Sequence, residues 1–453
     1  MLANLQPFYW GVSTAAYQIE GAHNSQGKGA SIWDVFANIP GKIHSRQNAN
    51  TSCDFYHQYY RDIALMSQMN IPNFRFSLSW SRLFPSGTGM VNPKGVEFYN
   101  KVIDFCLDLN IEPWITLYHW DLPYELELKG GWTNREIINW FTDYVQKCIR
   151  LFGDRVKHWL ILNEPMVFTG AGYFLGVHAP GKRGLNNFLA AAHHAALCQA
   201  EGTRAAKACL AAGKIGTTFS CSLIEPNTSS EQDASAAKRV DALINRMFIE
   251  PLCGLGYPVK DLKLLNRLEP FIKDGDEAKL KADVDFIGVQ NYTREMISHS
   301  YTTPLLWAKV VKASKRNVTH TVMDWEVYPA SIYNMLKRFN EYGKKMIVTE
   351  NGAAFPDEMI NGRVHDTERT DYLKQHIAQV LKARQEGINV HGYFVWSLMD
   401  NFEWAEGYHP RFGLVHVDYN TLKRTIKDSG HWYASFIESQ RLSHPLYSNS
   451  AIA

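Results

Sequence analysis

The chain has 453 residues, which is enough for two or three ordinary domains or for one large α/β barrel with insertions. Apolar residues make up 45% and charged residues 20%, which is typical of a soluble globular protein and excludes a disordered or fibrous chain. Because 47 Lys and Arg face 45 Asp and Glu, the net charge of +2 gives no overall field that would attract nucleic acid or anionic lipid. We expect a small neutral substrate, no nucleic-acid partner and no membrane partner.

Short apolar runs of strand character alternate with longer segments of helical periodicity along the chain. The predicted strands cover residues 8–12, 73–78, 112–117, 158–162, 214–219, 284–289, 345–349 and 390–396. The predicted helices cover residues 53–69, 93–109, 134–152, 186–212, 234–249, 330–342 and 368–386. This alternation favours an α/β fold, a (β/α)8 TIM barrel closed by right-handed crossovers, with a doubly wound open sheet as the alternative.

No internal repeat, low-complexity tract or Pro- and Ser-rich linker divides the chain. Long connections follow the first, fifth and sixth predicted strands, including residues 17–53 and 292–323. We therefore expect residues 1–453 to form a single barrel domain whose extended βα loops build an active-site pocket.

Two glutamates stand where predicted strands end. The fourth strand runs into Asn163-Glu164 and the seventh into Glu350-Asn351-Gly352. For either motif alone, a helix cap or a turn acid is the simpler interpretation. On a barrel, however, the strand ends share one face, and strands four and seven lie across the pocket from each other. That position permits a carboxyl separation of about 5–5.5 Å, the range for a retaining double displacement of a glycoside.

The predicted strands deliver other chemistry-bearing side chains to the same face. They are Tyr17, Gln18 and Glu20 after the first strand, Arg75 on the second, His119, Trp120 and Asp121 after the third, Gln290, Asn291 and Tyr292 after the sixth, and Trp396, Asp400, Glu403 and Trp404 at or after the eighth. Paired rim carboxyls indicate acid/base or nucleophilic chemistry, and aromatic rings can stack on the apolar faces of sugars.

Ordered motifs spread over the chain match one known family. They are WGVSTAAYQIEG at residues 10–21, SIWD at 31–34, FRFSLSWSR at 74–82, LYHWDLP at 117–123, NEP at 163–165 and TENG at 349–352. From residue 8 to about residue 436, the chain resembles glycoside hydrolase family 1, the β-glucosidases and their relatives. The resemblance implies hydrolysis of a β-glycoside by two glutamates.

The resemblance also implies a role for each matching residue. Glu164 would be the acid/base that protonates the leaving oxygen, and Glu350 would be the nucleophile that attacks the anomeric carbon. Arg75 and Tyr292 would orient the nucleophile, and Arg75 would keep it ionised. The substrate-binding set would be Gln18, His119, Trp120, Asn163, Asn291, Trp325, Trp396, Glu403 and Trp404. For Trp120 and Trp325, ordinary core packing stays an open alternative.

We therefore predict a retaining β-glucosidase that hydrolyses terminal non-reducing β-D-glucosyl residues from small β-glucosides and cello-oligosaccharides. β-Galactosides and β-fucosides are expected as further substrates, because Gln18 and Glu403 can hold either orientation of the 4-hydroxyl. A 6-phospho-β-glycosidase is an alternative, although the acidic stretch from Glu403 to Glu406 would repel a phosphate. A sugar-binding barrel without turnover is the alternative from a different class of protein.

Seven cysteines without a Cys-x-x-Cys pair argue against a disulfide framework and a structural zinc site. The N-terminal segment lacks a basic region followed by a long apolar one, and no apolar stretch reaches membrane-spanning length. We expect a cytoplasmic protein. Neither His193-His194 nor the loop at residues 21–29 has the partners or spacing of a metal or phosphate site, so we expect no metal and no cofactor.

Overall fold

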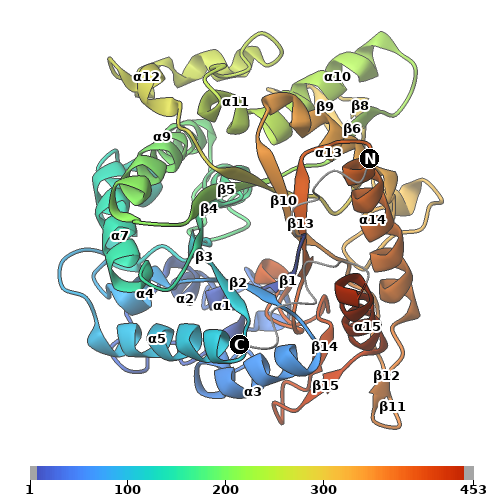
Figure 1. The fold of residues 1–453 in the computed structure, drawn as a ribbon. Coiled ribbons are helices and arrows are strands. Elements are labelled where there is room, and N and C mark those ends of the chain that lie inside the picture. The colour runs from blue at the N-terminus through green and yellow to red at the C-terminus, as the bar shows by residue number, and fades with distance from the viewer. Residues whose placement is uncertain (1–7, 443–453) are drawn as a thin grey trace.

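The chain folds around a closed barrel of parallel strands. A computed structural model describes residues 8–442. The barrel strands are β1 (Tyr9–Ser13), β2 (Asn73–Ser77), β3 (Glu112–Tyr118), β4 (His158–Asn163), β5 (Lys214–Ser220), β7 (Phe286–Gln290), β10 (Lys345–Asn351) and β13 (Val390–Trp396). They follow one another around the ring in the order β1-β13-β10-β7-β5-β4-β3-β2. Figure 1, which looks along the barrel, shows the strands as an inner ring and the helices as an outer one.

Helices connect the strands and cover the barrel. The longer ones are α3 (Phe55–Gln68), α5 (Pro93–Asp108), α7 (Ile137–Phe152), α9 (Leu185–Cys209), α10 (Glu231–Asp241), α13 (Ala330–Phe339), α14 (Thr367–Gln385) and α15 (Asp428–Leu442). The short ones are α1 (Ala16–Ile19), α2 (Ile32–Phe36), α4 (Trp80–Leu83), α6 (Tyr124–Glu127), α8 (Pro165–Thr169), α11 (Ile249–Leu252) and α12 (Asp276–Leu280). Local rules fix their starts: Asn92 caps α5, which begins with a proline, and Ser31 forms a capping box with Asp34 at α2. Among residues 8–442, no helix is both long and apolar enough to span a bilayer.

The strand pairing confirms the predicted (β/α)8 barrel. Strand β1 pairs in parallel with both β2 and β13, with Val12 beside Val395, so the ring closes and the open-sheet alternative is wrong. Helix ends shift by a few residues from the predicted ones. The segment predicted as helix through residue 249 leaves the α conformation after Asp241, where a π-helical stretch (Ala242–Arg246) begins. Helix α15 has no counterpart among the predicted helices.

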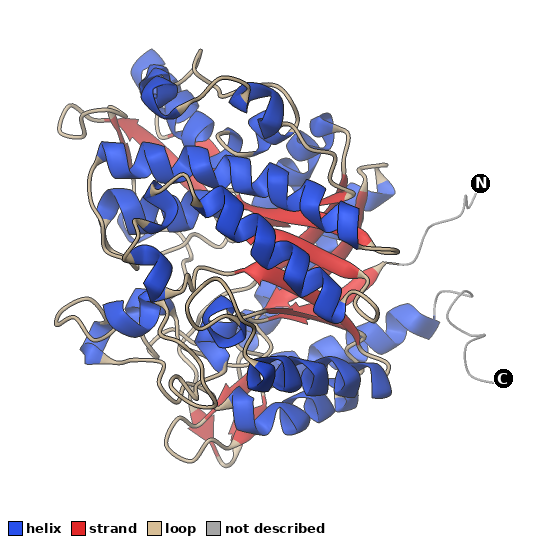
Figure 2. Cartoon of the chain, turned by 90° about the vertical axis from the view of Figure 1, so that its left-hand side faces the viewer, coloured by secondary structure: helices blue, strands red, loops and turns tan. Residues whose placement is uncertain are grey.

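Long connections after β1, β5 and β7 extend beyond the carboxyl end of the barrel. The last two contribute β6 (Leu223–Pro226), β8 (Arg294–His299) and β9 (Ala308–Val310), which pair as a small sheet. Residues 292–323 are therefore not only loop, as the sequence predicts, but contain two short strands. Two further pairs are β11 (Met359–Ile360) with β12 (Arg363–Val364), and β14 (Val415–Val417) with β15 (Arg424–Ile426). Figure 2, a side view, shows helices lying along the barrel and many loops gathered beyond one of its ends.

Large side chains fill the barrel near the starts of its strands. Trp114, Leu160, Phe286, Ile347 and Phe394 form a buried cluster there, each from a different strand. A Cβ at Gly11 would lie 2.5 Å from the Phe394 ring and 2.7 Å from the Asn73 carbonyl, so only glycine lets β1 pass this cluster. Because these side chains fill the barrel interior, the pocket lies at the other end, where the carboxyl ends of the strands meet.

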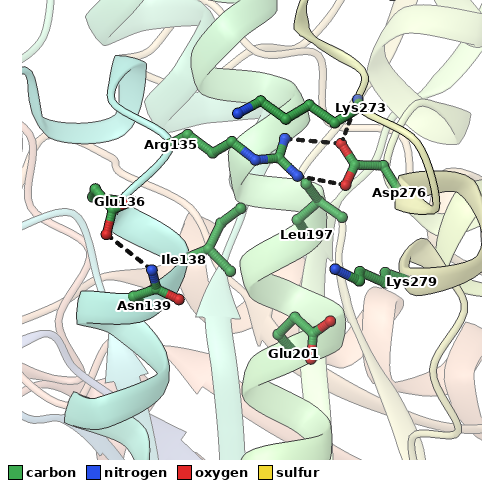
Figure 3. Close-up of a pocket in the computed structure, with 9 residues that line it drawn as sticks. All are labelled: Arg135, Glu136, Ile138, Asn139, Leu197, Glu201, Lys273, Asp276 and Lys279. Carbon is green, nitrogen blue, oxygen red and sulfur yellow. Dashed lines mark hydrogen bonds and ion pairs between the residues drawn. The ribbon is translucent and has the colours of Figure 1, made fainter.

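A hollow on the outer wall surrounds a buried carboxylate where α7, α9 and α12 meet (Figure 3). Asp276 accepts hydrogen bonds from Arg135 at 2.8 and 2.5 Å, and from the Lys273 amide at 2.8 Å. The Nε2 atom of His193 lies 3.0 Å from the same carboxylate. Because protein groups satisfy this carboxylate, we interpret the hollow as a joint that ties the three helices together.

Candidate active site

A cavity of about 370 Å³ opens at the carboxyl end of the barrel. The predicted site residues that line it are His119, Trp120, Glu164, Tyr292, Trp325, Glu350, Trp396, Glu403 and Trp404. Gln18, Arg75 and Asn163 lie behind that wall and hydrogen-bond to residues that line it. The barrel thus brings together side chains that are hundreds of positions apart in the chain.

Glu350 is held from two sides at the end of β10. The Nη1 atom of Arg75 donates to its Oε1 at 2.5 Å, and the Tyr292 hydroxyl donates to its Oε2 at 2.7 Å. Burial raises the pKa of Glu350, while the Arg75 charge and the Tyr292 hydrogen bond oppose that rise. Both donors stabilise the carboxylate form.

Glu164 stands on left-handed backbone between β4 and α8, with φ 46° and ψ 66°. Pro165 follows it and begins α8, since its fixed φ suits the first helical position. The Glu164 side chain lines the cavity, and no hydrogen bond from the described residues stabilises its charged form. Burial raises the pKa of Glu164 well above its ordinary value, and the Glu350 carboxylate raises it further.

The two carboxyls therefore differ in their surroundings. They come from β4 and β10, which are three strands apart in the ring. Glu350 has two donors, whereas no residue of the described part of the chain donates to Glu164, so Glu164 keeps its proton to a higher pH. A proton-bearing carboxyl and an ionised one in the same cavity can cleave a glycosidic bond by acid catalysis and nucleophilic attack. The carboxyl separation of about 5–5.5 Å stays a prediction.

Asn163 is the centre of a buried hydrogen-bond network behind the carboxyls. Its Oδ1 accepts from Arg75 Nη2 at 2.5 Å, from Gln290 Nε2 at 2.9 Å and from Thr218 Oγ1 at 3.0 Å. Gln290 also lines the cavity, and neither it nor Thr218 belongs to the predicted site set. The position of Gln290 at a strand end was a usable signal, whereas Thr218 has the β-branched side chain of an ordinary strand residue.

His119 lines the cavity and has one ring nitrogen without a partner among the described residues. The Asn163 amide, 3.0 Å away, donates to its Nε2, which assigns the ring proton to Nδ1. That Nδ1 is buried and has no partner among the described residues. Burial lowers the pKa of His119 well below its ordinary value, and the Arg75 charge adds to the effect, so the ring is neutral. Its N–H can donate to a hydroxyl of a bound molecule.

Gln18, which lies behind the cavity wall, forms an amide and carboxyl pair with Glu403, which lines it. The Nε2 atom of Gln18 donates to Asn401 Oδ1 at 3.0 Å, to the Phe402 carbonyl at 2.9 Å and, more weakly, to Glu403 Oε2 at 3.4 Å. Its Oε1 is buried without a partner among the described residues. Burial raises the pKa of Glu403 to about 8, and the Glu350 charge adds to that rise. Both side chains have hydrogen-bonding capacity left for sugar hydroxyls.

Tryptophan rings form an aromatic wall. The Trp120 and Trp404 ring centroids lie 4.5 Å apart, and Trp120 also donates from Nε1 to the Asn163 carbonyl at 2.9 Å. Trp396, at the end of β13, lies 5.9 Å from the His119 ring. Because a hydrogen bond fixes Trp120 beside the cavity, its ring is a positioned surface as well as part of the packing.

Trp325 and Phe412 extend the aromatic lining toward β8. The Trp325 ring centroid lies 5.2 Å from that of Tyr292 and 6.0 Å from that of Phe412. Trp325 comes from the connection between β9 and α13. It therefore lines the cavity from outside the barrel.

Asn291, like Gln18, Arg75 and Asn163, lies behind the cavity wall. It is fully buried, does not line the cavity, and donates from Nδ2 to the carbonyls of Cys221 at 3.0 Å and Thr293 at 3.1 Å. These contacts fix the backbone of two segments that line the cavity.

Among residues 8–442, no group of three or more His, Cys, Asp or Glu side chains is placed to hold a metal ion.

Barrel, cavity and carboxyl pair together define a glycoside hydrolase. Residues 5–442 match the family model described as glycosyl hydrolase family 1, and the chain belongs to that family. A 1,4-beta-D-glucan glucohydrolase of Thermotoga neapolitana is 43% identical over 440 residues, which cover 96% of this chain and 98% of the relative. Beta-glucosidase A of Thermotoga maritima is 42% identical over 439 residues, with the same two coverages. A solved structure of a family 1 β-glucosidase from Thermotoga maritima matches with a TM-score of 0.92 at 41% identity, covering 96% of this chain and 98% of its own.

Proposed function

We propose that this family member is a retaining β-glucosidase, which releases terminal non-reducing β-D-glucosyl residues from small β-glucosides and cello-oligosaccharides. The observation that carries the proposal is the pair of buried, unlike carboxyls, Glu164 and Glu350, in one cavity. Relatives named for β-glucosidase and glucan glucohydrolase activity support this class of substrate.

In the first step, the Glu350 carboxylate attacks the anomeric carbon while Glu164 gives its proton to the leaving oxygen. The bond from carbon to the leaving oxygen breaks, its electron pair stays on that oxygen, and a glycosyl ester with Glu350 forms. Arg75 and Tyr292 hold the attacking carboxylate in one orientation before the reaction.

In the second step, Glu164 takes a proton from water, whose oxygen attacks the anomeric carbon and displaces Glu350. Esterification has neutralised the Glu350 charge, which in the free protein raises the pKa of Glu164. The Glu164 carboxyl is therefore a weaker acid before the first step than after it, as its change from acid to base requires. Two inversions leave the configuration of the sugar unchanged.

The remaining polar groups of the wall would bind the glucosyl unit. His119, Gln18 and Glu403 offer a donor, an acceptor and a carboxyl with unused capacity. Asn163 would contact the 2-hydroxyl, and Trp396 and Trp404 would stack on the ring. Gln18 and Glu403 together can serve an axial or an equatorial 4-hydroxyl, so we also propose turnover of β-galactosides and β-fucosides.

A chromogenic β-glucoside assay tests the function. The wild type should release p-nitrophenol from p-nitrophenyl β-glucoside, and Glu350→Ala should lose that activity by a factor of at least about 10⁴ because it lacks the nucleophile. Glu164→Ala should retain a far larger share of wild-type activity on 2,4-dinitrophenyl β-glucoside than on p-nitrophenyl β-glucoside, because the dinitrophenyl leaving group needs no proton. An inactive wild type, or a Glu350→Ala variant with full turnover, would exclude the enzymatic assignment and favour a sugar-binding barrel.

A 6-phospho-β-glycosidase remains the enzymatic alternative. Among the described residues, no Lys or Arg lines the cavity to pair with a phosphate, whereas the acidic side chains Glu350 and Glu406 do line it. The comparison of cellobiose with its 6-phosphate distinguishes the two, since a large preference for the phosphorylated sugar would overturn our use of Glu403.

We also propose that residues 1–453 form one catalytic domain and that the protein is cytoplasmic. One buried hydrophobic cluster that runs from Phe8 to Ile437 supports the first proposal. Seven free thiols, most of them buried, support the second, because such a set persists in a reducing compartment.

A further inference from the structure

Glu295 is an acidic side chain of the cavity to which the steps above give no role. It lies on β8, just beyond the Gln290 end of β7, and lines the same cavity as Glu350. Its side chain is partly buried, yet no described residue donates a hydrogen bond to its carboxyl. A carboxyl in this position has acceptor capacity that the protein itself does not use.

The basic residues near Glu295 are already paired with other acids. Arg294 donates to Glu326 at 2.9 and 2.8 Å and to Glu225 at 2.9 Å. Arg316 donates to Glu326 at 2.6 Å. Because successive side chains of a strand point to opposite faces, Arg294 and Glu295 diverge. Glu295 is therefore left out of the ion-pair cluster that holds β8 to its neighbours.

The charges around Glu295 leave it a hydrogen-bond acceptor near neutral pH. Burial raises its pKa to about 7, the Arg316 charge opposes this rise, and Asp324 and Glu326 add to it. A group with this pKa is a carboxylate in a large fraction of molecules at neutral pH and above. Its unsatisfied oxygens then favour a ligand that carries hydroxyl donors.

The neighbours of Glu295 in the cavity wall suit a sugar. Ser222 and Trp325 line the same cavity from outside the barrel, and Trp325 packs on Tyr292, which bonds to Glu350. An aromatic ring, a hydroxyl and a free carboxyl thus lie on the outward side of the two catalytic carboxyls. Rings that stack on a sugar face, together with carboxyls that accept from hydroxyl pairs, are a common means of binding saccharides.

We propose that Glu295 accepts hydrogen bonds from the leaving sugar and so makes this protein selective for saccharide leaving groups over aryl ones. This inference rests on the proposed β-glucosidase function. An aryl leaving group can stack on Trp325 without a hydrogen bond to the Glu295 carboxyl. A glucose leaving group can stack on the same ring and also donate from its hydroxyls to that carboxyl. Glu295 would thus be a specificity-determining residue that takes no part in bond cleavage.

Kinetics of Glu295→Gln and Glu295→Ala on two substrates test the inference. Loss of a hydrogen bond to a charged group predicts a fall of about 10-fold or more in kcat/KM for cellobiose, mostly through a higher KM. The value for p-nitrophenyl β-glucoside should stay within about 2-fold of the wild type, which also shows that the variants fold. Glu225→Gln is the matched control, because this acid pairs with Arg294, the neighbour of Glu295 on β8, and does not line the cavity.

The outcomes separate this inference from the proposed function. If the wild type does not hydrolyse p-nitrophenyl β-glucoside, the proposed function fails and takes the inference with it. If the wild type is active but the variants change both substrates by one factor, or change neither, the role of Glu295 is refuted while the function stands. A selective loss on cellobiose that Glu225→Gln does not share supports the inference.

Discussion

Arg75 links the proposed nucleophile to the hydrogen-bond network behind it. It is fully buried and gives one hydrogen bond each to Glu350, Asn163 and Thr116. Burial raises the pKa of Glu350 and of Glu164, and the Arg75 charge opposes both rises. One guanidinium therefore orients the proposed nucleophile and also sets the pH range in which that nucleophile is ionised.

Replacement of Arg75 should shift the pH dependence of turnover. The acid limb of kcat/KM follows protonation of Glu350, so activity falls as the pH drops through the pKa of that group. Without the Arg75 charge, the Glu350 pKa rises, and the acid limb of Arg75→Met should move to higher pH. We also expect a fall in kcat of about 100-fold or more, as for loss of a preorganised donor. The pH profile on p-nitrophenyl β-glucoside measures both effects.

Arg75→Lys is the matched variant for this experiment. It keeps a positive charge but cannot bridge Glu350 and Asn163 in a planar fork. Its acid limb should stay near that of the wild type, while its kcat falls. An acid limb that is the same in all three proteins would contradict the assigned effect of Arg75.

At the scale of elements, the joint between α7, α9 and α12 depends on Asp276. Burial raises the pKa of Asp276. Hydrogen bonds from Arg135, His193 and the Lys273 amide outweigh this effect and leave that pKa below its ordinary value. A carboxyl with a lowered pKa stabilises the fold above its unfolded pKa, and this contribution disappears as the pH falls through the folded one. The joint should therefore weaken in acid.

The Asp276→Asn variant tests this joint. At neutral pH it should lose about 2–3 kcal/mol of unfolding free energy, because the charged partner of Arg135 is gone. The difference from the wild type should shrink as the pH falls below about 4, because the Asp276 carboxyl of the unfolded wild type then takes up a proton while that of the folded protein is still charged. Urea unfolding at several pH values measures the difference. Asp274→Asn, an exposed neighbour, should change little at any pH.

A second joint ties the start of α15 to the loop that carries Glu403. The Lys427 ammonium is fully buried and pairs with Asp357 and with Asp400, the latter at 2.6 Å. Its removal leaves two buried carboxylates without this partner, so Lys427→Met should lower the unfolding free energy by about 3–5 kcal/mol. Urea unfolding with Lys423→Met as the exposed control measures the loss. Equal stability of the two variants would contradict this assignment.

For the whole molecule, the barrel could be predicted because its strands are short buried apolar runs between long periodic helices. The sheet of β6, β8 and β9 could not be, since its strands have 4, 6 and 3 residues and the pairing of β6 with β8 joins segments that are far apart in the chain. Helix α15 was missed because it buries Ser429 and Gly430 beside Tyr433 and Ile437, which makes a weak apolar pattern.

The residues of the candidate site likewise include some that could be predicted from the sequence and others that could not. Glu164 and Glu350 could be predicted because both end barrel strands, whose carboxyl ends always meet at one face. Glu295 could not be, because its direction depends on β8, whose pairing with β6 joins distant parts of the chain. The hydrogen bonds that distinguish the two glutamates, from Arg75 and Tyr292, also depend on how distant segments fold together.

The thiols of the whole chain give a test of how tightly the molecule is packed. All seven cysteines are free, and only Cys209 and Cys253 are partly exposed. Burial raises the pKa of Cys53 to about 12, and protonated buried thiols react slowly. Mass spectrometry after treatment with a thiol reagent should find labels at these two positions in the native protein and at all cysteines after denaturation. Fast native labelling of the double variant Cys209→Ser, Cys253→Ser would contradict this packing.

The left-handed backbone at Glu164 also limits how stable the protein can become. A non-glycine residue in that region costs about 1–2 kcal/mol. Calorimetry should therefore find that Glu164→Gly unfolds at a higher temperature than Glu164→Ala, although both lack the carboxyl. The residue that best suits the backbone cannot carry a proton. At this one position, selection for heat tolerance and selection for turnover act in opposite directions.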